Sequence, residues 1–314
     1  MRPRFAMLIA LVLAAVALTY AGSRFALSLS PPVVRASLPH RPRSYLGVYE
    51  DGSPPAYQPV ADFATAVDKQ PNLVGYFSGW AEPFATSFAE RIHAHSATPF
   101  VQIDPTLASV SGIAAGDYDG YLSSYADSVR DYAHPVVIGF GHEMNSTAYS
   151  WGYGNVPPPV FIAAWRHIVT LFREQGAYNI TWLWTIEADH LGTGPIADWW
   201  PGAKYVTWVG IDGYYYRPTD TFATVFAPTI NQVHAFTRKP VLLSETAVGP
   251  QAGQIAKIRN LFTGMRQYDM LGLVWFDKDQ DQGIYHQDWR IEGNVAAETA
   301  FKLHAADLTL ARPR

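Results

Sequence analysis

Two glutamates, Glu143 and Glu245, are the residues whose type and setting point most directly to chemistry. Glu143 stands in Phe140-Gly-His-Glu-Met-Asn145 and Glu245 in Leu243-Ser-Glu-Thr-Ala247, and each lies just after a short apolar run. Glycosidic cleavage with retention needs a carboxylate nucleophile and a second carboxyl group, about 5–5.5 Å away, that protonates the leaving oxygen. Partial desolvation and the charge of the nucleophile keep that second group protonated. The pair suits this chemistry if the fold brings the two segments together.

Eight short apolar runs alternate with longer amphipathic segments, and these runs must position the two glutamates. They are residues 45–49, 73–77, 99–103, 135–140, 180–184, 205–211, 240–243 and 271–276. They are rich in β-branched and aromatic residues and bounded by Gly, Pro or Asp, as strands of a parallel sheet buried on both faces are. We therefore predict an α/β fold, a single-domain (β/α)8 TIM barrel over residues 45–308. An open doubly wound sheet is disfavoured, because residues 50–55 lack the spacing of a phosphate-binding loop.

In such a barrel the active site lies at the C-terminal ends of the strands. The residues expected there are mainly carboxylates and aromatics: Glu50, Trp80, Asp104, His142, Glu143, Glu187, Asp212, Tyr214, Glu245, Trp275 and Asp277. Strands four and seven lie nearly across the barrel mouth, so Glu143 and Glu245 can converge over its axis. Each glutamate alone could instead cap a helix or pair with an arginine, but both together favour a catalytic pair. One histidine offers too few ligands for a metal site, so we expect no metal and no cofactor.

The chain from Tyr45 to about His304 resembles glycoside hydrolase family 26. The main motifs are Gly-His142-Glu143-Met144-Asn145 with Trp151-Gly152, and Leu243-Ser244-Glu245. Supporting segments are 75–80, 200–214 and Trp275-Phe276. The resemblance implies a barrel with catalytic glutamates after strands four and seven, in which Glu143 is the acid/base and Glu245 the nucleophile.

The same resemblance implies roles in substrate binding. His142 would line the subsite of the cleaved sugar, and Trp275 would form the floor beneath that sugar. Tyr214 would hydrogen-bond the nucleophile, although Tyr215, in the same Tyr-Tyr-Tyr run, is an alternative.

Three further residues have two interpretations each. Trp80 and Trp151 would either stack on sugars from the rim or pack in the fold. Asn145 would either contact sugar or serve as a turn residue. We interpret the remaining strand-end acids Asp104, Glu187, Asp212 and Asp277 as part of the loop and barrel-end structure, with contact to the substrate as the less favoured alternative.

The sequence departs from the family pattern at a position that bears on the substrate. Mannan-cleaving relatives usually read His-Glu-Met-Asn-Gly-x-Trp, but here Ser146-Thr147-Ala148 follows Asn145, and Tyr149 or Trp151 would have to replace the lost Trp. We predict a retaining endo-β-glycanase acting on β-mannan or a related β-linked polysaccharide. The alternatives are a β-1,3/1,4-glucan or β-1,3-xylan hydrolase, or an envelope transglycosylase of the same fold. A non-catalytic surface carbohydrate-binding barrel is disfavoured by the presence of both glutamates.

Composition supports a carbohydrate partner. Aromatic residues make up 14% of the chain, the formal net charge is −4, and there is no cysteine. Aromatic rings suit the flat faces of sugars. Nucleic acid would require clustered Lys and Arg, which are absent from the sequence after the first residues. We expect a monomer that binds a polysaccharide and no nucleic acid.

The N-terminus predicts export. Arg2 and Arg4 precede an uncharged run from Phe5 to Tyr20, which is followed by small residues. We interpret residues 1–22 as a signal peptide or an N-terminal membrane anchor and residues 23–44 as a Pro/Arg-containing linker. Both interpretations place the protein outside the cytoplasm, either secreted or tethered to a membrane.

Overall fold

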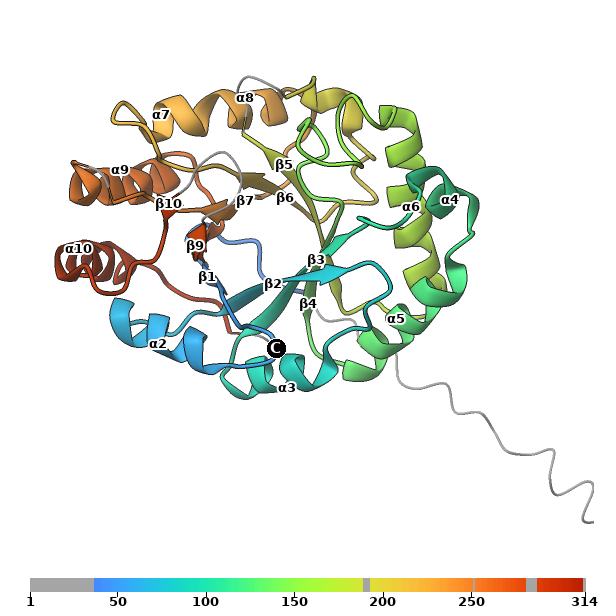
Figure 1. Ribbon diagram of the computed structural model, residues 1–314, viewed down its shortest axis with the longest axis horizontal. Helices are drawn as coiled ribbons and strands as arrows, with labels where there is room; N and C mark the ends of the chain where they lie inside the picture. Colours follow the sequence, from blue (N-terminus) through green and yellow to red (C-terminus); the bar gives the residue numbers. More distant parts are fainter. Residues whose placement is uncertain (1–36, 189–192, 251, 281–286, 313–314) are drawn as a thin grey trace, which may run out of the picture. The chain divides into compact units, whose positions relative to one another are not determined.

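Eight parallel strands close into a barrel in the computed structural model, as the alternating pattern predicted (Figure 1). The structure describes residues 37–188, 193–250, 252–280 and 287–312. The strands are β1 (Tyr45–Glu50), β2 (Leu73–Gly79), β3 (Thr98–Asp104), β4 (Val136–Phe140), β5 (Ile180–Glu187), β6 (Trp208–Asp212), β7 (Val241–Thr246) and β8 (Gly272–Asp277). All eight predicted strands are found, and β1 pairs with β8 to close the barrel.

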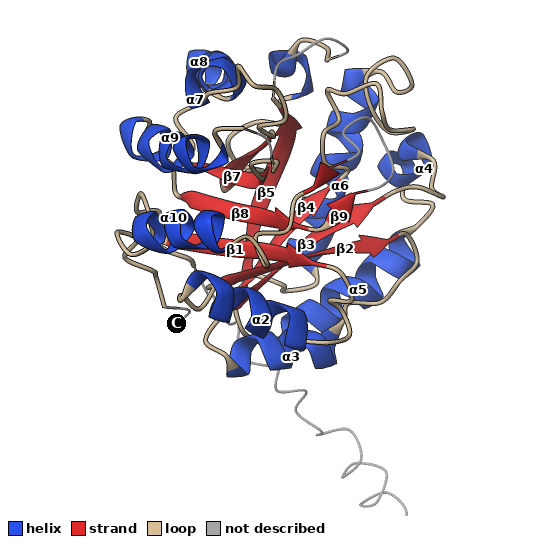
Figure 2. Ribbon diagram, turned by 60° about the vertical axis from the view of Figure 1, so that its left-hand side comes forward, coloured by secondary structure: helices blue, strands red, loops and turns tan. Residues whose placement is uncertain are grey.

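Helices surround the strands on the outside, as Figure 2 shows. They are α2 (Gln58–Val67), α3 (Thr86–Ala94), α4 (Val110–Ala115), α5 (Asp119–Tyr132), α6 (Pro158–Glu174), the 3-10 turn η1 (Ile196–Trp199), α7 (Phe222–Val225), α8 (Ala227–Phe236), α9 (Gln254–Gln267) and α10 (Val295–Ala305). A small antiparallel hairpin, β9 (Asp279–Gln280) with β10 (Gln287–Asp288), follows β8. In α6, Phe161, Trp165 and Ile168 recur at helical spacing and are buried.

The core forms two layers because side chains alternate along each strand. One layer fills the space between strands and helices, and the other fills the barrel interior with residues such as Tyr49, Phe100 and Trp208. Gly75 makes room in the interior, since a Cβ there would lie 2.5 Å from the ring of Tyr49. The mouth of the barrel is thereby supported from below by close-packed aromatic rings.

The end of the predicted linker packs against the barrel. Leu38 is buried in the interior cluster, and the Trp208 indole N–H donates a 2.6 Å hydrogen bond to His40 Nδ1. Residues 37–44 are therefore part of the barrel unit. Residues 1–36, which hold the predicted signal or anchor and most of the predicted linker, lie outside the described residues.

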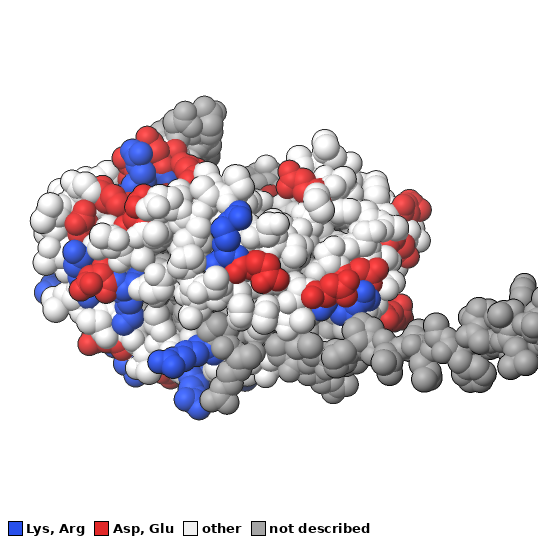
Figure 3. All heavy atoms as spheres, turned by 90° about the horizontal axis from the view of Figure 1, so that it is seen from below, with Lys and Arg blue, Asp and Glu red and all other residues white. Residues whose placement is uncertain are grey.

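The distribution of surface charge and the composition of the helices concern possible binding to nucleic acid and to membranes. Lys and Arg lie interspersed with Asp and Glu on the face seen in Figure 3. Among the described residues, no helix combines the length and the apolar character needed to cross a bilayer.

Candidate active site

A pocket of about 730 Å³ opens at the C-terminal ends of the strands, where the barrel rule places the active site. Most of its lining comes from strand ends and the loops that follow them. These residues include Phe77, Asp104, His142, Glu143, Tyr149, Glu187, Asp212, Tyr214, Tyr216, Arg217, Asp220, Glu245, Phe276 and Gln280. Both glutamates singled out from the sequence are among them.

Glu143 and Glu245 converge in this pocket, together with Asp212. One carboxylate oxygen of each of the three lies within 4.8 Å of the others. All three side chains are buried, with exposed fractions of 9% for Glu143, 5% for Glu245 and 0% for Asp212. The fold thus brings together two segments that are far apart in the sequence.

The loop after β4 holds Glu143 in an uncommon backbone conformation. Its φ is 52°, a left-handed value that costs a residue with a Cβ roughly 1–2 kcal/mol. Its backbone N–H donates to Thr185 O at 3.0 Å, and its carbonyl accepts from Ser146 N at 2.8 Å. These contacts with β5 and with the loop itself hold the carboxyl group over the barrel axis.

The surroundings of Glu143 favour its protonated form. Burial is the main cause, and the charge of His142 and a hydrogen bond from Tyr149 oppose it. The charges of Glu187 and Glu245 act in the same direction as burial, and together they raise the pKa of Glu143 to about 8. At neutral pH this carboxyl group can donate a proton.

Glu245 has a different set of contacts. The Tyr214 hydroxyl donates a 2.7 Å hydrogen bond to Glu245 Oε2. Burial raises the pKa of Glu245, whereas the charge of His142, this hydrogen bond and the charge of Lys278 lower it. The hydrogen bond from Tyr214 orients the carboxylate and stabilises its charge.

Asp212 is a third, fully buried carboxyl group in the cluster. Ser244 Oγ donates to its Oδ1 at 2.5 Å. Burial and the charges of Glu245 and Glu143 raise the pKa of Asp212 well above its usual range. Its Oδ2 and Glu245 Oε1 are both buried without a hydrogen-bond partner. A protonated Asp212 can therefore coexist with an ionised Glu245, although two adjacent carboxylates would repel.

His142 is held between two side chains. Its Nδ1 lies 2.9 Å from Asp104 Oδ1, and its Nε2 lies 3.1 Å from Tyr149 Oη. Desolvation lowers the pKa of His142, but the charge and hydrogen bond of Asp104 outweigh it and raise the pKa to about 9. The imidazolium donates to Asp104 and Tyr149, which leaves the Tyr149 hydroxyl proton for Glu143.

Tyr214, not its neighbour Tyr215, contacts the nucleophile candidate. Tyr215 is fully buried, and its hydroxyl donates to Asn260 Oδ1 at 3.1 Å. The predicted contact between Tyr214 and Glu245 is present in the structure, and the alternative role for Tyr215 is not.

Trp275 does not line the pocket, so its predicted place as a floor is wrong. Its side chain is fully buried, its indole N–H donates to Trp289 O at 3.1 Å, and its ring packs edge-on against Phe301 of α10. Because side chains alternate along β8, Val274 and Phe276 face the interior and Trp275 faces the helices. Of these two neighbouring residues of β8, Phe276 is the one that lines the pocket.

Trp80 and Trp151 also lie outside the pocket lining, which favours the packing interpretation of both. Trp80 packs against Tyr118 and Tyr121. The Trp151 indole N–H donates to His142 O at 2.8 Å, and its ring stacks on Tyr149 with centroids 4.5 Å apart. Trp151 thus supports two pocket residues from behind.

Asn145 is fully buried and makes no contact with the pocket, so the predicted sugar contact is not supported. Its amide nitrogen donates to Glu187 O at 2.9 Å, and its Oδ1 accepts from Glu187 N at 2.9 Å. Asn145 therefore fastens the loop after β4 to the end of β5, close to Glu143.

Several lining residues were missed in the sequence. Phe77 stacks on Tyr49 with ring centroids 5.1 Å apart and lies beside His142. Inward alternation along the second strand could have identified it. Tyr216 and Arg217 reach the pocket from the loop after β6, where no periodic pattern indicates which side chains turn inward.

Comparison with known proteins agrees with the geometry. The family model of glycosyl hydrolase family 26 matches residues 66–304. Endoglucanase H of Acetivibrio thermocellus is 26% identical over 80% of this chain and 29% of its own length. A β-1,3-xylanase of an Alcaligenes species is 25% identical over 63% of this chain and 43% of its own length. The chain thus spans less than half the length of these relatives.

Solved structures share the fold. A mannanase from Bacillus subtilis superposes with a TM-score of 0.66 at 15% identity, covering 87% of each chain. A modular endo-β-1,4-mannanase from Cellulomonas fimi gives a TM-score of 0.65 at 14% identity, covering 89% of this chain and 77% of the other. The family match extends over most of the barrel and includes both glutamates. The chain therefore belongs to glycosyl hydrolase family 26, as its motifs predicted.

Proposed function

We propose that this protein is a retaining endo-β-glycanase in which Glu143 is the acid/base and Glu245 is the nucleophile. One observation carries the proposal: carboxylate oxygens of these two residues lie within 4.8 Å of each other in the barrel-mouth pocket. Retaining enzymes separate their carboxyl groups by about 5–5.5 Å, whereas inverting enzymes leave about 6.5–9.5 Å for a water molecule.

In the first step, Glu245 attacks the anomeric carbon while the bond to the leaving oxygen breaks. The hydrogen bond from Tyr214 directs the carboxylate toward the pocket. Glu143 transfers its proton to the leaving oxygen, so the departing sugar leaves as a neutral alcohol. Because the pKa of Glu143 is about 8, its carboxyl group carries that proton at neutral pH.

In the second step, Glu143 is ionised and acts as a base. It takes a proton from water as the water oxygen attacks the anomeric carbon and releases Glu245. The charged His142 and the hydroxyl of Tyr149 stabilise Glu143 in its ionised form at this stage. The contacts with His142 and Tyr149, which keep the pKa of Glu143 from rising further, thus also assist hydrolysis of the glycosyl-enzyme.

The pocket supports endo action on a polymer. Beyond the glutamates it continues along the loop after β6, where Tyr216, Arg217 and Asp220 line it. Phe77 and Phe276 supply aromatic faces near the glutamates, suited to sugar rings. We propose β-mannan or a related β-linked polysaccharide as the substrate. Two observations favour adding glucan and β-1,3-xylan to the candidate substrates. The chain has Ser146-Thr147-Ala148 after Asn145, and its relatives include proteins named as an endoglucanase and as β-1,3-xylanases.

The apolar run in residues 5–20 favours action outside the cytoplasm.

The glycanase proposal is tested by measuring reducing-end release from β-mannans, mixed-linkage β-glucan, cellulose and β-1,3- and β-1,4-xylans. The wild type is assayed beside Glu143→Ala and Glu245→Ala, and NMR follows the anomeric configuration of the first product. We expect a β-anomer from one polymer class and losses of several orders of magnitude in both variants. Activity that survives Glu245→Ala, or an inverted first product, would refute the assignment.

A further inference from the structure

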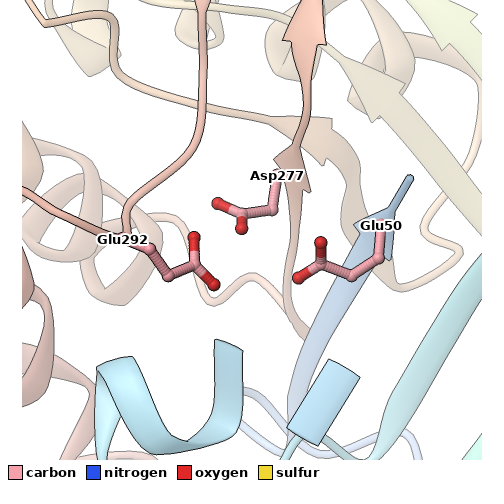
Figure 4. A group of neighbouring side chains, drawn as sticks. All are labelled: Glu50, Asp277 and Glu292. Atoms are coloured by element: carbon pink, nitrogen blue, oxygen red, sulfur yellow. The ribbon is translucent and has the colours of Figure 1, made fainter. Parts of the chain in front are cut away.

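A second group of acidic side chains lies at the ends of β1 and β8, and none of its members lines the active-site pocket. Glu50 ends β1, Asp277 ends β8, and Glu292 lies in the segment before α10. Figure 4 shows the three carboxyl groups pointing toward one another, and one oxygen of each lies within 4.8 Å of the others. Glu50 and Asp277 are paired in register, so the barrel itself places two of the three.

The protein contacts of this acidic triad leave oxygens unsatisfied. Glu50 is 8% exposed and Asp277 is 2% exposed. Asp277 Oδ1 accepts from the backbone N–H of Ile291 at 2.8 Å. Glu50 Oε1 and Glu292 Oε2, by contrast, are buried without a hydrogen-bond partner. A buried polar group without a partner is unfavourable unless something else binds it.

Among the described residues, no Lys or Arg forms an ion pair with the triad, although the charge of Arg290 interacts with that of Asp277. Lys278 pairs with Asp51 at 3.5 Å, and Arg290 pairs with the exposed acids of the hairpin. Neither forms an ion pair with Glu50, Asp277 or Glu292. Three carboxyl groups so close together require either protons or a bound cation to offset their charge.

The donor set selects a hard cation. All the converging donors are carboxylate oxygens, with no imidazole or thiolate among them, and this combination suits Ca²⁺ or Mg²⁺ and not Zn²⁺. The three oxygens lie within 4.8 Å of one another, close enough for one ion to bind all of them, and Ca²⁺ accepts about six to eight oxygen ligands in a flexible geometry. Mg²⁺ demands bonds of about 2.0–2.1 Å in a near-ideal octahedron. We propose that Glu50, Asp277 and Glu292 form a calcium-binding site, with bidentate carboxylates and water completing the coordination.

A bound ion would fix the segment between β8 and α10. This segment carries Trp289, whose backbone N–H donates to Lys278 O at 2.8 Å and whose indole N–H donates to Gln280 Oε1 at 2.8 Å. The Trp289 ring lies against Tyr214, with centroids 4.9 Å apart. The ion therefore ties the two strand ends to a segment that packs on the partner of Glu245.

Protons are the competing explanation for the triad. Burial and neighbouring carboxylates raise the pKa of Glu50 to about 9 and that of Asp277 to about 11. Proton sharing would hold the carboxyl groups together without an ion, and it would give no response to added calcium.

The experiment titrates the chelator-treated full chain with CaCl2 in a calorimeter at neutral pH. In parallel, TbCl3 is added and its tryptophan-sensitised luminescence is followed, since Trp289 stands three residues before Glu292 and its backbone N–H donates to Lys278, the residue after Asp277. We expect one site per chain, weakened about 10- to 100-fold or more in Glu50→Gln and Glu292→Gln. Saturating Ca²⁺ should raise the Tm of the wild type by about 5 °C.

Asp51→Asn is the matched control, because Asp51 is exposed and contributes no oxygen to the triad; its charge acts on Glu50 only from outside, so its loss should weaken binding far less than Glu50→Gln does. Glu292 is only partly buried, so Glu292→Gln keeps the test available if Glu50→Gln fails to fold. No binding and no shift in Tm would show that protons neutralise the triad and would overturn the proposal. Binding that persists in both Gln variants but is lost in Glu245→Gln would overturn it too, by placing the ion in the active site.

Discussion

Replacing Tyr214 by Phe removes the hydrogen bond that the Tyr214 hydroxyl donates to Glu245. The hydroxyl donates at 2.7 Å to a carboxylate that is 5% exposed, so the bond is charge-assisted and largely shielded from water. Such a bond contributes about 1.5–3 kcal/mol. If that stabilisation is needed to keep Glu245 ionised and oriented, kcat/KM should fall about 10- to 150-fold.

The pH profile provides a second readout. Tyr214 lowers the pKa of Glu245, so its removal raises that pKa and moves the acidic limb of kcat/KM to higher pH. Tyr215→Phe is the matched control, because Tyr215 is the adjacent tyrosine and its hydroxyl contacts Asn260 outside the pocket. Steady-state assays of both variants from pH 4 to 9 measure the two effects. Equal losses in both variants, or an unmoved acidic limb in Tyr214→Phe, would refute the reasoning.

Three further predictions follow from the same contacts. Glu143 has a pKa of about 8 in the folded chain, against about 4.5 when unfolded, so its ionisation costs stability as the pH rises between these values. Glu143→Gln should therefore raise Tm at pH 8 more than at pH 5; a pH-independent difference in scanning fluorimetry would contradict this. Phe276→Leu keeps most of the packing volume but removes the aromatic face, so it should raise KM with little loss of Tm. Trp275→Phe should instead lower Tm and leave KM unchanged, and reversed effects would support Trp275 as the floor. Asn145→Ala removes two hydrogen bonds to the buried backbone of Glu187, and urea denaturation should show a loss of about 1–3 kcal/mol in the free energy of unfolding; an unchanged free energy would argue that Asn145 does not fasten the loop to β5.

The barrel was predictable because each parallel strand is buried on both faces and therefore appears as an apolar run. All eight runs became strands, with ends shifted by up to three residues. The pair Glu143 and Glu245 was predictable for a related reason, since every strand of a barrel ends at the same rim. Strand order placed these two carboxyl groups at the same rim, and their flanking motifs singled them out from the other strand-end acids.

The side of a strand on which an aromatic residue lies was harder to predict. In β8, Trp275 and Phe276 are both large and apolar, so composition does not reveal which of them faces the interior. The answer depends on registering the whole strand against the barrel, where Val274 and Phe276 share one face. The positions of loop residues such as Arg217 and Glu292 could not be predicted from sequence periodicity, because the path of a loop depends on tertiary contacts.

The family resemblance implies the roles proposed for the two glutamates, and their neighbours in the structure give a physical reason for them. Both glutamates are buried, and burial alone would raise the pKa of both. Glu245 has Tyr214 as a hydrogen-bond donor and feels the charge of Lys278, which together favour its ionised form. Glu143 faces the charges of Glu187 and Glu245, which favour its protonated form, while His142 and Tyr149 keep that proton available for transfer. On the proposed assignment, the contacts of the two glutamates across the barrel mouth suit Glu245 to the role of nucleophile and Glu143 to that of acid.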